Sequence, residues 1–147
     1  MKVQARVTGG DAIRKRLVAL GPATTRAIWP VVVDGALRIQ GDAVRSILSQ
    51  KGSEVVTRYK PKRDVLVSPP GEAPNSDTGR LAKSITVDLN KGRLSARVYT
   101  DLEYAKWLEY GTRSMDARPF LGPAYERQKN SILDEIEKAL AEAVESV

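Results

Sequence analysis

The sequence predicts an α+β fold built around an antiparallel sheet of three to five strands. Two long segments repeat apolar residues at helical spacing, and several short segments alternate apolar and polar residues. The two kinds of segment do not alternate regularly along the chain, which argues against a parallel, doubly wound sheet. We therefore expect a long central helix and a C-terminal helix to cover one face of the sheet. At 147 residues, we expect a single domain over 1–147 with a projecting loop or hairpin.

The first segments predict a strand and then a short helix. Apolar and polar residues alternate through residues 2–8, and Gly9-Gly10 ends the strand. Asp11 can cap a helix that Gly21-Pro22 stops, and its apolar residues recur at helical spacing (Ile13, Leu17 and Leu20).

Residues 24–50 predict the main core helix. Its buried face is expected to carry six aliphatic side chains: Ile28, Val32, Ala36, Ile39, Ala43 and Ile47. The opposite stripe alternates charge at i,i+3 and i,i+4 spacing, which suits a solvated or inter-subunit face: Asp34, Arg38, Asp42 and Arg45. Pro30 is expected either to kink this helix or to start it.

Residues 51–79 interrupt the periodicity with several prolines and glycines, so we interpret them as an arm or loop outside the core. Two strand-like segments, 55–59 and 65–67, flank the basic segment 60–63. A projecting hairpin is one interpretation. A disordered surface loop is the other, and the sequence leaves both open.

The remaining segments predict a hairpin and two helices. Residues 84–89 and 94–100 alternate around a turn at 90–92, with Ile85, Val87 and Leu89 expected to point inward. Residues 78–81 are expected to turn tightly into the first of these strands. Asp101 can cap a short helix that Gly111 ends. The last helix is expected to begin near Pro123, with an apolar face made of Tyr125, Ile132, Ile136, Leu140, Ala143 and Val144.

The composition predicts a protein that is not an enzyme. The chain has no cysteine and no histidine, which excludes thiolate nucleophiles, histidine-based triads and histidine- or cysteine-containing metal sites. The eighteen acidic residues are scattered without a clustered motif. We expect neither a catalytic site nor a metal or cofactor.

The net charge of +6 is unevenly distributed. Residues 1–120 hold 21 lysines and arginines against 12 acidic residues, whereas residues 121–147 hold three against six. A basic body could meet nucleic acid or the acidic face of a neighbouring copy. A small basic DNA-binding protein is therefore the alternative function, although no known DNA-reading motif is present.

No segment predicts membrane association. The longest apolar run, 28–33, is interrupted by Pro30, and the first residues lack the continuous apolar stretch of a secretory signal. We expect synthesis and residence in a cytoplasm.

Three segments occur in an order that resembles one known family. They are Pro70-Gly71-Glu72-Ala73-Pro74 followed by residues 78–85 (TGRLAKSI), then residues 104–112 (YAKWLEYGT), and then residues 118–126 (RPFLGPAYE). This pattern is similar to the tail-component or tail-completion (neck) proteins of long-tailed double-stranded DNA bacteriophages. Residues 51–68 depart from the pattern.

The resemblance implies a structural virion subunit. Such a protein would form a homo-oligomeric ring, hexameric or dodecameric, at the phage head–tail junction or tail top, as a tail-completion, terminator or head–tail joining protein. Its partners would be neighbouring neck or tail-tube proteins and the genomic DNA passing through the channel. It would reside in the virion, and in the cytoplasm of the bacterial host during assembly.

We select nine residues as candidates for subunit or ring contacts. Glu109 and Glu126 could pair with arginines within or between subunits, or remain solvated. Trp107 and Phe120 are expected to pack in the core, since aromatic side chains at helical spacing usually do. The nine candidates are Arg58, Lys60, Lys62, Arg63, Glu109, Tyr110, Arg113, Arg118 and Glu126.

Overall fold

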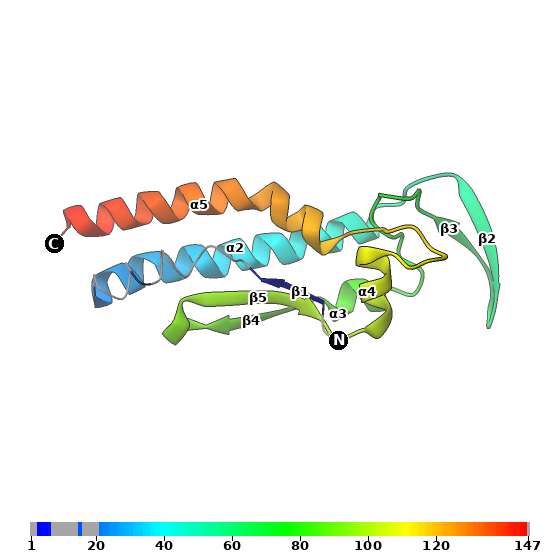
Figure 1. Ribbon diagram of the computed structural model, residues 1–147, viewed down its shortest axis with the longest axis horizontal. Coiled ribbons are helices and arrows are strands. Elements are labelled where there is room, and N and C mark those ends of the chain that lie inside the picture. Colours follow the sequence, from blue (N-terminus) through cyan, green and yellow to red (C-terminus); the bar gives the residue numbers. More distant parts are fainter. Residues whose placement is uncertain (1–2, 7–14, 16–20, 147) are drawn as a thin grey trace.

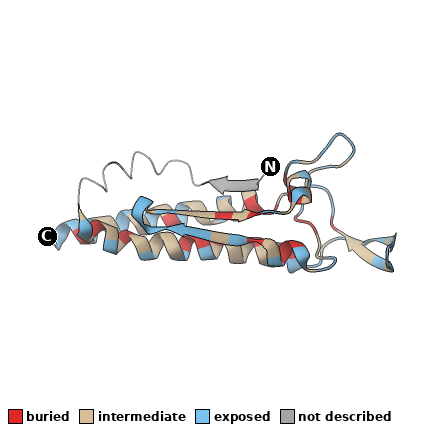
Figure 2. Ribbon diagram, turned by 90° about the horizontal axis from the view of Figure 1, so that it is seen from below, coloured by how far each residue is buried: buried red, intermediate tan, exposed pale blue. Residues whose placement is uncertain are grey.

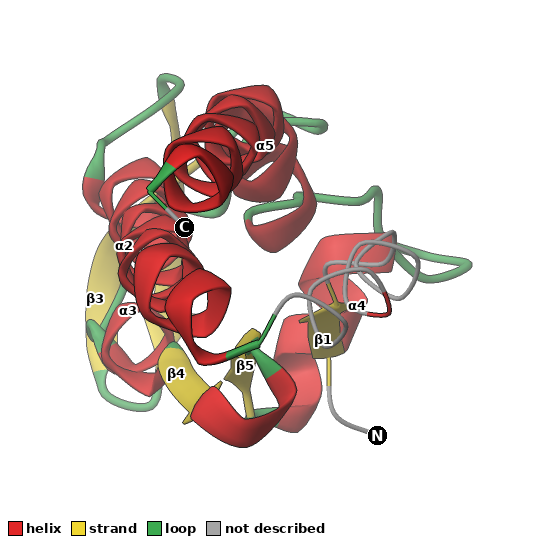
Figure 3. Cartoon of the chain, turned by 90° about the vertical axis from the view of Figure 1, so that its left-hand side faces the viewer, coloured by secondary structure: helices red, strands yellow, loops and turns green. Residues whose placement is uncertain are grey.

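The computed structural model describes residues 3–6, 15 and 21–146, and the elements stack in three layers (Figure 1). Helix α5 (Leu121–Glu145) lies on α2 (Pro22–Leu48), and α2 lies on an antiparallel sheet of order β1-β5-β4. The end-on view separates the same layers (Figure 3). The strands of this sheet are β1 (Val3–Arg6), β4 (Thr86–Asn90) and β5 (Ser95–Thr100). A second sheet, the hairpin of β2 (Glu54–Tyr59) and β3 (Lys62–Val67), projects from one end.

The α+β class, the antiparallel pairing and the two long helices confirm the coarse prediction, but the predicted position of α5 was wrong. The described strands form a three-stranded sheet and the separate two-stranded hairpin of β2 and β3. Helix α5 packs mainly on α2 and has few contacts with the sheet. The two long helices therefore do not share one face of the sheet, because α2 has a buried side toward each neighbour.

The contact between α2 and α5 explains the charged stripe on α2. Arg38 pairs with Asp34 one turn earlier, at 3.0 Å, and with Glu135 of α5, at 2.8 Å. Asp42 accepts a hydrogen bond from Arg127 of α5, at 2.9 Å. Burial alone would raise the pKa of Asp42, but the hydrogen bonds from Arg127 and Gln128 outweigh it, so the pKa is lowered. Arg38 and Asp42 of the stripe thus face the second long helix, whereas Asp34 and Arg45 remain exposed.

Small side chains bring α2 and α5 close together. A Cβ atom at Gly35 would lie 3.0 Å from the side chain of Ile132, so the residue at this crossing must be small. Five of the six aliphatic residues expected on the buried face of α2 are buried, and Val32 is half-buried. Pro30 lies inside α2 and neither starts nor ends it.

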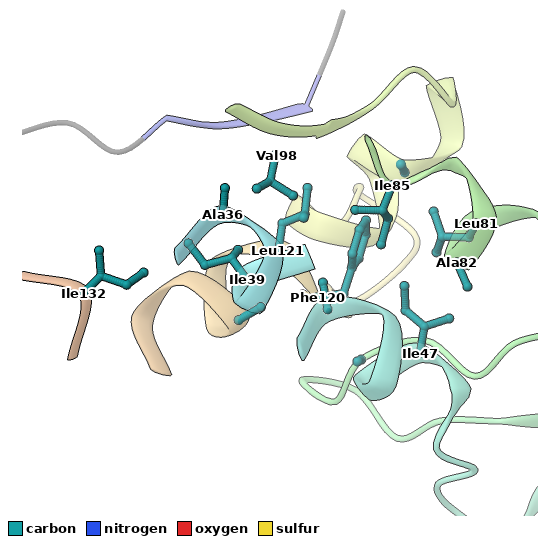
Figure 4. Packing of buried hydrophobic residues seen from close by; sticks show 14 residues of the cluster. Ala36, Ile39, Ile47, Leu81, Ala82, Ile85, Val98, Phe120, Leu121 and Ile132 are labelled. Atoms are coloured by element: carbon teal, nitrogen blue, oxygen red, sulfur yellow. The ribbon is translucent and has the colours of Figure 1, made fainter. Parts of the chain in front are cut away.

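The core lies where α2, β5 and the start of α5 meet (Figure 4). Phe120 and Ile47 are fully buried there, next to Val98 of β5 and Leu81 of α3 (Arg80–Ser84). Buried residues recur along the helices and strands of the body, whereas the two strands of the projecting hairpin are exposed or half-buried throughout (Figure 2).

Several local predictions need correction. Residues 80–84 form the short helix α3, which begins after Gly79, where a strand entry was expected. The turn between β4 and β5 is a 3₁₀ helix, Lys91–Arg93, in which the side chain of Asn90 accepts a hydrogen bond from the amide of Arg93. Leu89 and Val144 are exposed, although both were expected to point inward. The short helix expected before Gly21-Pro22 lies, except for Lys15, outside the described residues.

Helix α4 (Glu103–Tyr110) confirms a predicted helix but not the burial of its tryptophan. Phe120 is 0% exposed, as expected, whereas Trp107 is 49% exposed. The helix buries Ala105 and Glu109 instead, and Trp107 points away from them. Trp107 therefore joins the candidate contact residues.

None of the described helices has a stretch long and apolar enough to cross a membrane.

Replacing Phe120 by alanine should destabilise the fold by about 3–5 kcal/mol, because a fully buried aromatic ring leaves a cavity between α2, α3 and β5. Urea unfolding followed by circular dichroism measures the loss. Trp107→Ala is the matched control and should change stability by less than about 1 kcal/mol, since half of the side chain is exposed. Equal losses in both variants would contradict this assignment of the core.

Candidate functional site

Segments far apart in the sequence meet at the hairpin end of the molecule. The amide of Gly71 donates a hydrogen bond to the carbonyl oxygen of Ala117, at 2.9 Å. Arg118 donates through Nε to the carbonyl oxygen of Ser68, at 3.1 Å, and through its amide to that of Leu108. The exit of the hairpin, the end of α4 and the loop before α5 are therefore held together (Figure 1).

Glu109 is the central residue of this end. Its side chain is buried, and Oε2 accepts hydrogen bonds from the amides of Phe120 and Leu121, at 2.9 and 3.1 Å. Oε1 accepts one from the amide of Gly122, at 2.8 Å. The first amides of a helix have no partner within the helix, and its N-terminus carries a partial positive charge. The carboxylate from α4 therefore caps α5.

The close approach of Glu109 favours glycine at position 122. A Cβ atom at position 122 would lie 3.0 Å from Oε1 of Glu109, so glycine allows the close approach. Helix α5 has no side-chain cap from its own N-cap residue, Phe120. The missing local cap, together with a glutamate at the end of the preceding helix, is the sequence signal that could have revealed this role.

Of the two possibilities for Glu109 and Glu126, an ion pair with a nearby arginine does not occur in the described part of the chain. Glu109 binds backbone amides, and Arg118 binds a backbone carbonyl oxygen. Both act as internal braces. Arg113 and Glu126 are exposed and form no ion pair with other described residues. Of the candidates outside the arm, Tyr110, Arg113 and Glu126 thus remain on the surface.

The arm forms a hairpin in which six residues of β2 pair with six of β3. Asn75 ties its base to the body, because its side chain accepts from the amide of Lys51 and donates to the carbonyl oxygens of Lys51 and Leu66. The projecting hairpin, one of the two interpretations of this segment, is thus the one that the structure adopts.

Asp77 engages two of the four basic candidates of the arm. Arg63 donates two hydrogen bonds to its carboxylate, at 2.8 and 2.7 Å, and Arg58 lies 3.6 Å away. The hydrogen bond from Arg63 holds the pKa of Asp77 below its ordinary value, so the pair persists at neutral pH and is lost only as pH falls below that value. Lys60 and Lys62 are exposed at the tip and pair with no described acidic residue.

Exposed aromatic rings gather at the same end. Trp107 is 49% and Tyr110 65% exposed, three residues apart on α4, and Tyr59 is 75% exposed on the hairpin. A groove of about 330 Å³ separates the hairpin from α4 and is lined by apolar residues of both, Val65 and Leu108 among them. Exposed aromatic residues are typical of the centres of protein–protein contacts. This end is suited to binding another protein.

The sequence matches one family model. The model is described as "Bacteriophage HK97-gp10, putative tail-component" and matches residues 11–111, which is more than half of the chain. The matched range contains the segments 70–74 and 78–85 and nearly all of 104–112, so the resemblance to tail components is confirmed. The segment 118–126 lies beyond it. No curated protein and no solved structure matches the chain.

Replacing Glu109 by alanine should destabilise the protein by about 2–4 kcal/mol, because three amides at the start of α5 lose their acceptor in a buried place. Glu109→Gln keeps the shape but loses the charge, and it should cost less. Denaturant unfolding measures both variants, with the exposed Glu126→Ala as control. If Glu109→Ala were as stable as Glu126→Ala, the capping role would be wrong.

Replacing Asp77 by asparagine should loosen the hairpin without unfolding the body. The variant removes the charge that Arg58 and Arg63 share, and Asn75 still holds the base. Hydrogen exchange of amides in residues 54–67 should therefore become faster, while that of α2 stays unchanged. The control is Asp88→Asn, which removes an exposed ion pair on β4. Unchanged exchange in the hairpin would refute a role for Asp77 as its anchor.

Proposed function

Because the chain belongs to the HK97-gp10-like family of bacteriophage tail components, we propose that it forms a ring at the phage head–tail junction or at the top of the tail. There it would complete or terminate the tail, or join it to the head. Family membership carries this proposal. A tail component acts in the virion through contacts with other virion proteins, and the candidate residues are interpreted accordingly.

The shape of the molecule supports a ring subunit. The body is elongated, with the hairpin at one end and the last turns of α5 at the other (Figure 1). Rings form when a surface of one copy binds a different surface of the next copy and the rotation closes. Tyr59, Trp107 and Tyr110 supply exposed rings for such contacts at the hairpin end.

The proposed role of the protein is structural and not catalytic. At the hairpin end, Glu109 and Arg118 hydrogen-bond to backbone amides and carbonyl oxygens, as expected of residues that brace the structure. The sequence supplies no histidine or cysteine for the usual nucleophiles and bases. The net charge of +6 suits a subunit whose ring surrounds genomic DNA.

A small DNA-binding protein is the second candidate. The observation that favours it is the exposed tip of the hairpin, where Lys60 and Lys62 stand beside Tyr59. Lysines that contact phosphates make duplex binding fall steeply with salt, because counterions are released on binding. Micromolar, salt-dependent binding of plain duplex by a monomer would favour this candidate over the ring.

Electron microscopy of the purified protein, alone and mixed with tail tubes, tests the proposed function. We expect closed rings, and a ring seated on one end of each tube. The number of subunits in a ring can then be counted in class averages. Only monomers in both preparations would contradict the proposal.

Shortening the hairpin should separate folding from assembly. Glu54 and Val67 pair directly across its base, so replacing residues 54–66 by two glycines closes the chain without straining the body. The variant should keep its helical circular dichroism but fail to join heads to tails when added to extracts that lack the protein. Arg93→Ala, at an exposed turn of the other sheet, is the control. Normal joining by the shortened variant would exclude a role for the hairpin.

A further inference from the structure

The outward face of the β2–β3 hairpin is a sheet surface without a partner in the described chain. Cross-strand register places Val55 opposite Leu66, Thr57 opposite Asp64 and Tyr59 opposite Lys62 on this face. Val55 is 59% exposed, and Tyr59 is 75% exposed. The opposite face carries Arg58 and Arg63, which turn toward Asp77 of the body.

The tip of this face is positively charged. Lys60 and Lys62 are exposed, and no described acidic residue pairs with either. The two arginines of the hairpin are already engaged by Asp77, so these lysines hold its free positive charge. A protein surface that complements this one would therefore combine apolar contact with carboxylates.

The second half of α5 has this complementary chemistry. Its exposed side combines Val144, which is 53% exposed, and one lysine, Lys138, with four acidic residues that form no ion pair with described residues: Asp134, Glu137, Glu142 and Glu145. The last turn of α5 carries no basic residue. The C-terminus of a helix carries a partial negative charge. The acidic residues near the end of α5 add to this charge, so this end favours a positively charged partner.

The two surfaces cannot meet within one molecule. The hairpin projects from one end of the elongated body, and the last turns of α5 lie at the other end (Figure 1). A contact between them can therefore form only between molecules. Contact between two different surfaces on successive copies is also the arrangement that closes into a ring.

We propose that the outward face of the hairpin, through Val55, Tyr59, Lys60 and Lys62, docks on the second half of α5 of a neighbouring copy of this chain. This inference rests on the proposed ring function and names the contact that builds the ring. Val55 and Tyr59 cover the apolar strip of Ala141 and Val144. Lys60 and Lys62 approach the acidic residues on either side of that strip.

Cysteine cross-linking tests the contact directly, since the natural chain has no cysteine and gives no background. Val55→Cys combined with Ala141→Cys places one thiol on each surface, and both positions are exposed. Treatment of assembled protein with a short bis-maleimide should give a ladder of covalent multimers on a denaturing gel. The control combines Val55→Cys with Glu126→Cys, an exposed position on the first half of α5, and should give no ladder.

Charge reversal gives an independent readout. Lys60→Glu with Lys62→Glu should reduce the multimer yield about five- to tenfold at low salt, because two attractive pairs become repulsive. Adding Glu137→Lys and Glu145→Lys to the same chain should restore it. All four positions are exposed, so the folded monomer should persist, and circular dichroism checks this.

The outcomes separate this inference from the proposed function. Rings that form without the Val55–Ala141 ladder would overturn the docking while leaving the ring intact. Absence of rings from the wild-type protein, alone and on tail tubes, would overturn both. If charge reversal abolished duplex DNA binding but left the multimers unchanged, the lysines would serve nucleic acid and the docking would also be wrong.

Discussion

The carboxylate of Glu109 accepts hydrogen bonds from the amides of Phe120, Leu121 and Gly122, and the position of α5 depends on this contact. It joins the last turn of α4 to the first turn of α5 across the loop 111–120. Phe120 then enters the core, and α5 leaves along α2. Arg118 extends the brace to the base of the hairpin by binding the carbonyl oxygen of Ser68. One buried charge thus organises the end of the molecule where the hairpin and the exposed aromatic residues lie.

A brace of this kind leaves the surface free for binding. Glu109 and Arg118, which hold the hairpin end together, direct their polar groups inward, toward backbone atoms, so these groups do not compete with a partner. Trp107 and Tyr110, on the outer side of the same helix that supplies Glu109, remain exposed. A tail component whose function is contact with other proteins needs both a rigid support and an apolar surface, and α4 provides them on opposite sides.

The sequence predicted what depends on local periodicity. Residues 24–50 anticipated α2 to within two residues at each end, and the buried face from Ile28 to Ile47 was correct, because helical spacing marks a buried stripe directly. The sequence did not predict the features that depend on contacts between residues far apart in the chain. Trp107 has core spacing but lies on the outer face of α4, and the partners of Glu109 are 11–13 residues away in an irregular loop. The place of α5 on α2 instead of on the sheet depends on Gly35 and Ile132, which no local pattern connects.

Amide hydrogen exchange of Phe120, Leu121 and Gly122, resolved by nuclear magnetic resonance, tests the central role of Glu109 most directly. The first amides of a helix normally exchange fast, because they have no partner within the helix. Here all three should exchange as slowly as amides in the middle of α5, since the carboxylate binds them in a buried place. Fast exchange at these three positions, with the rest of α5 protected, would contradict the account.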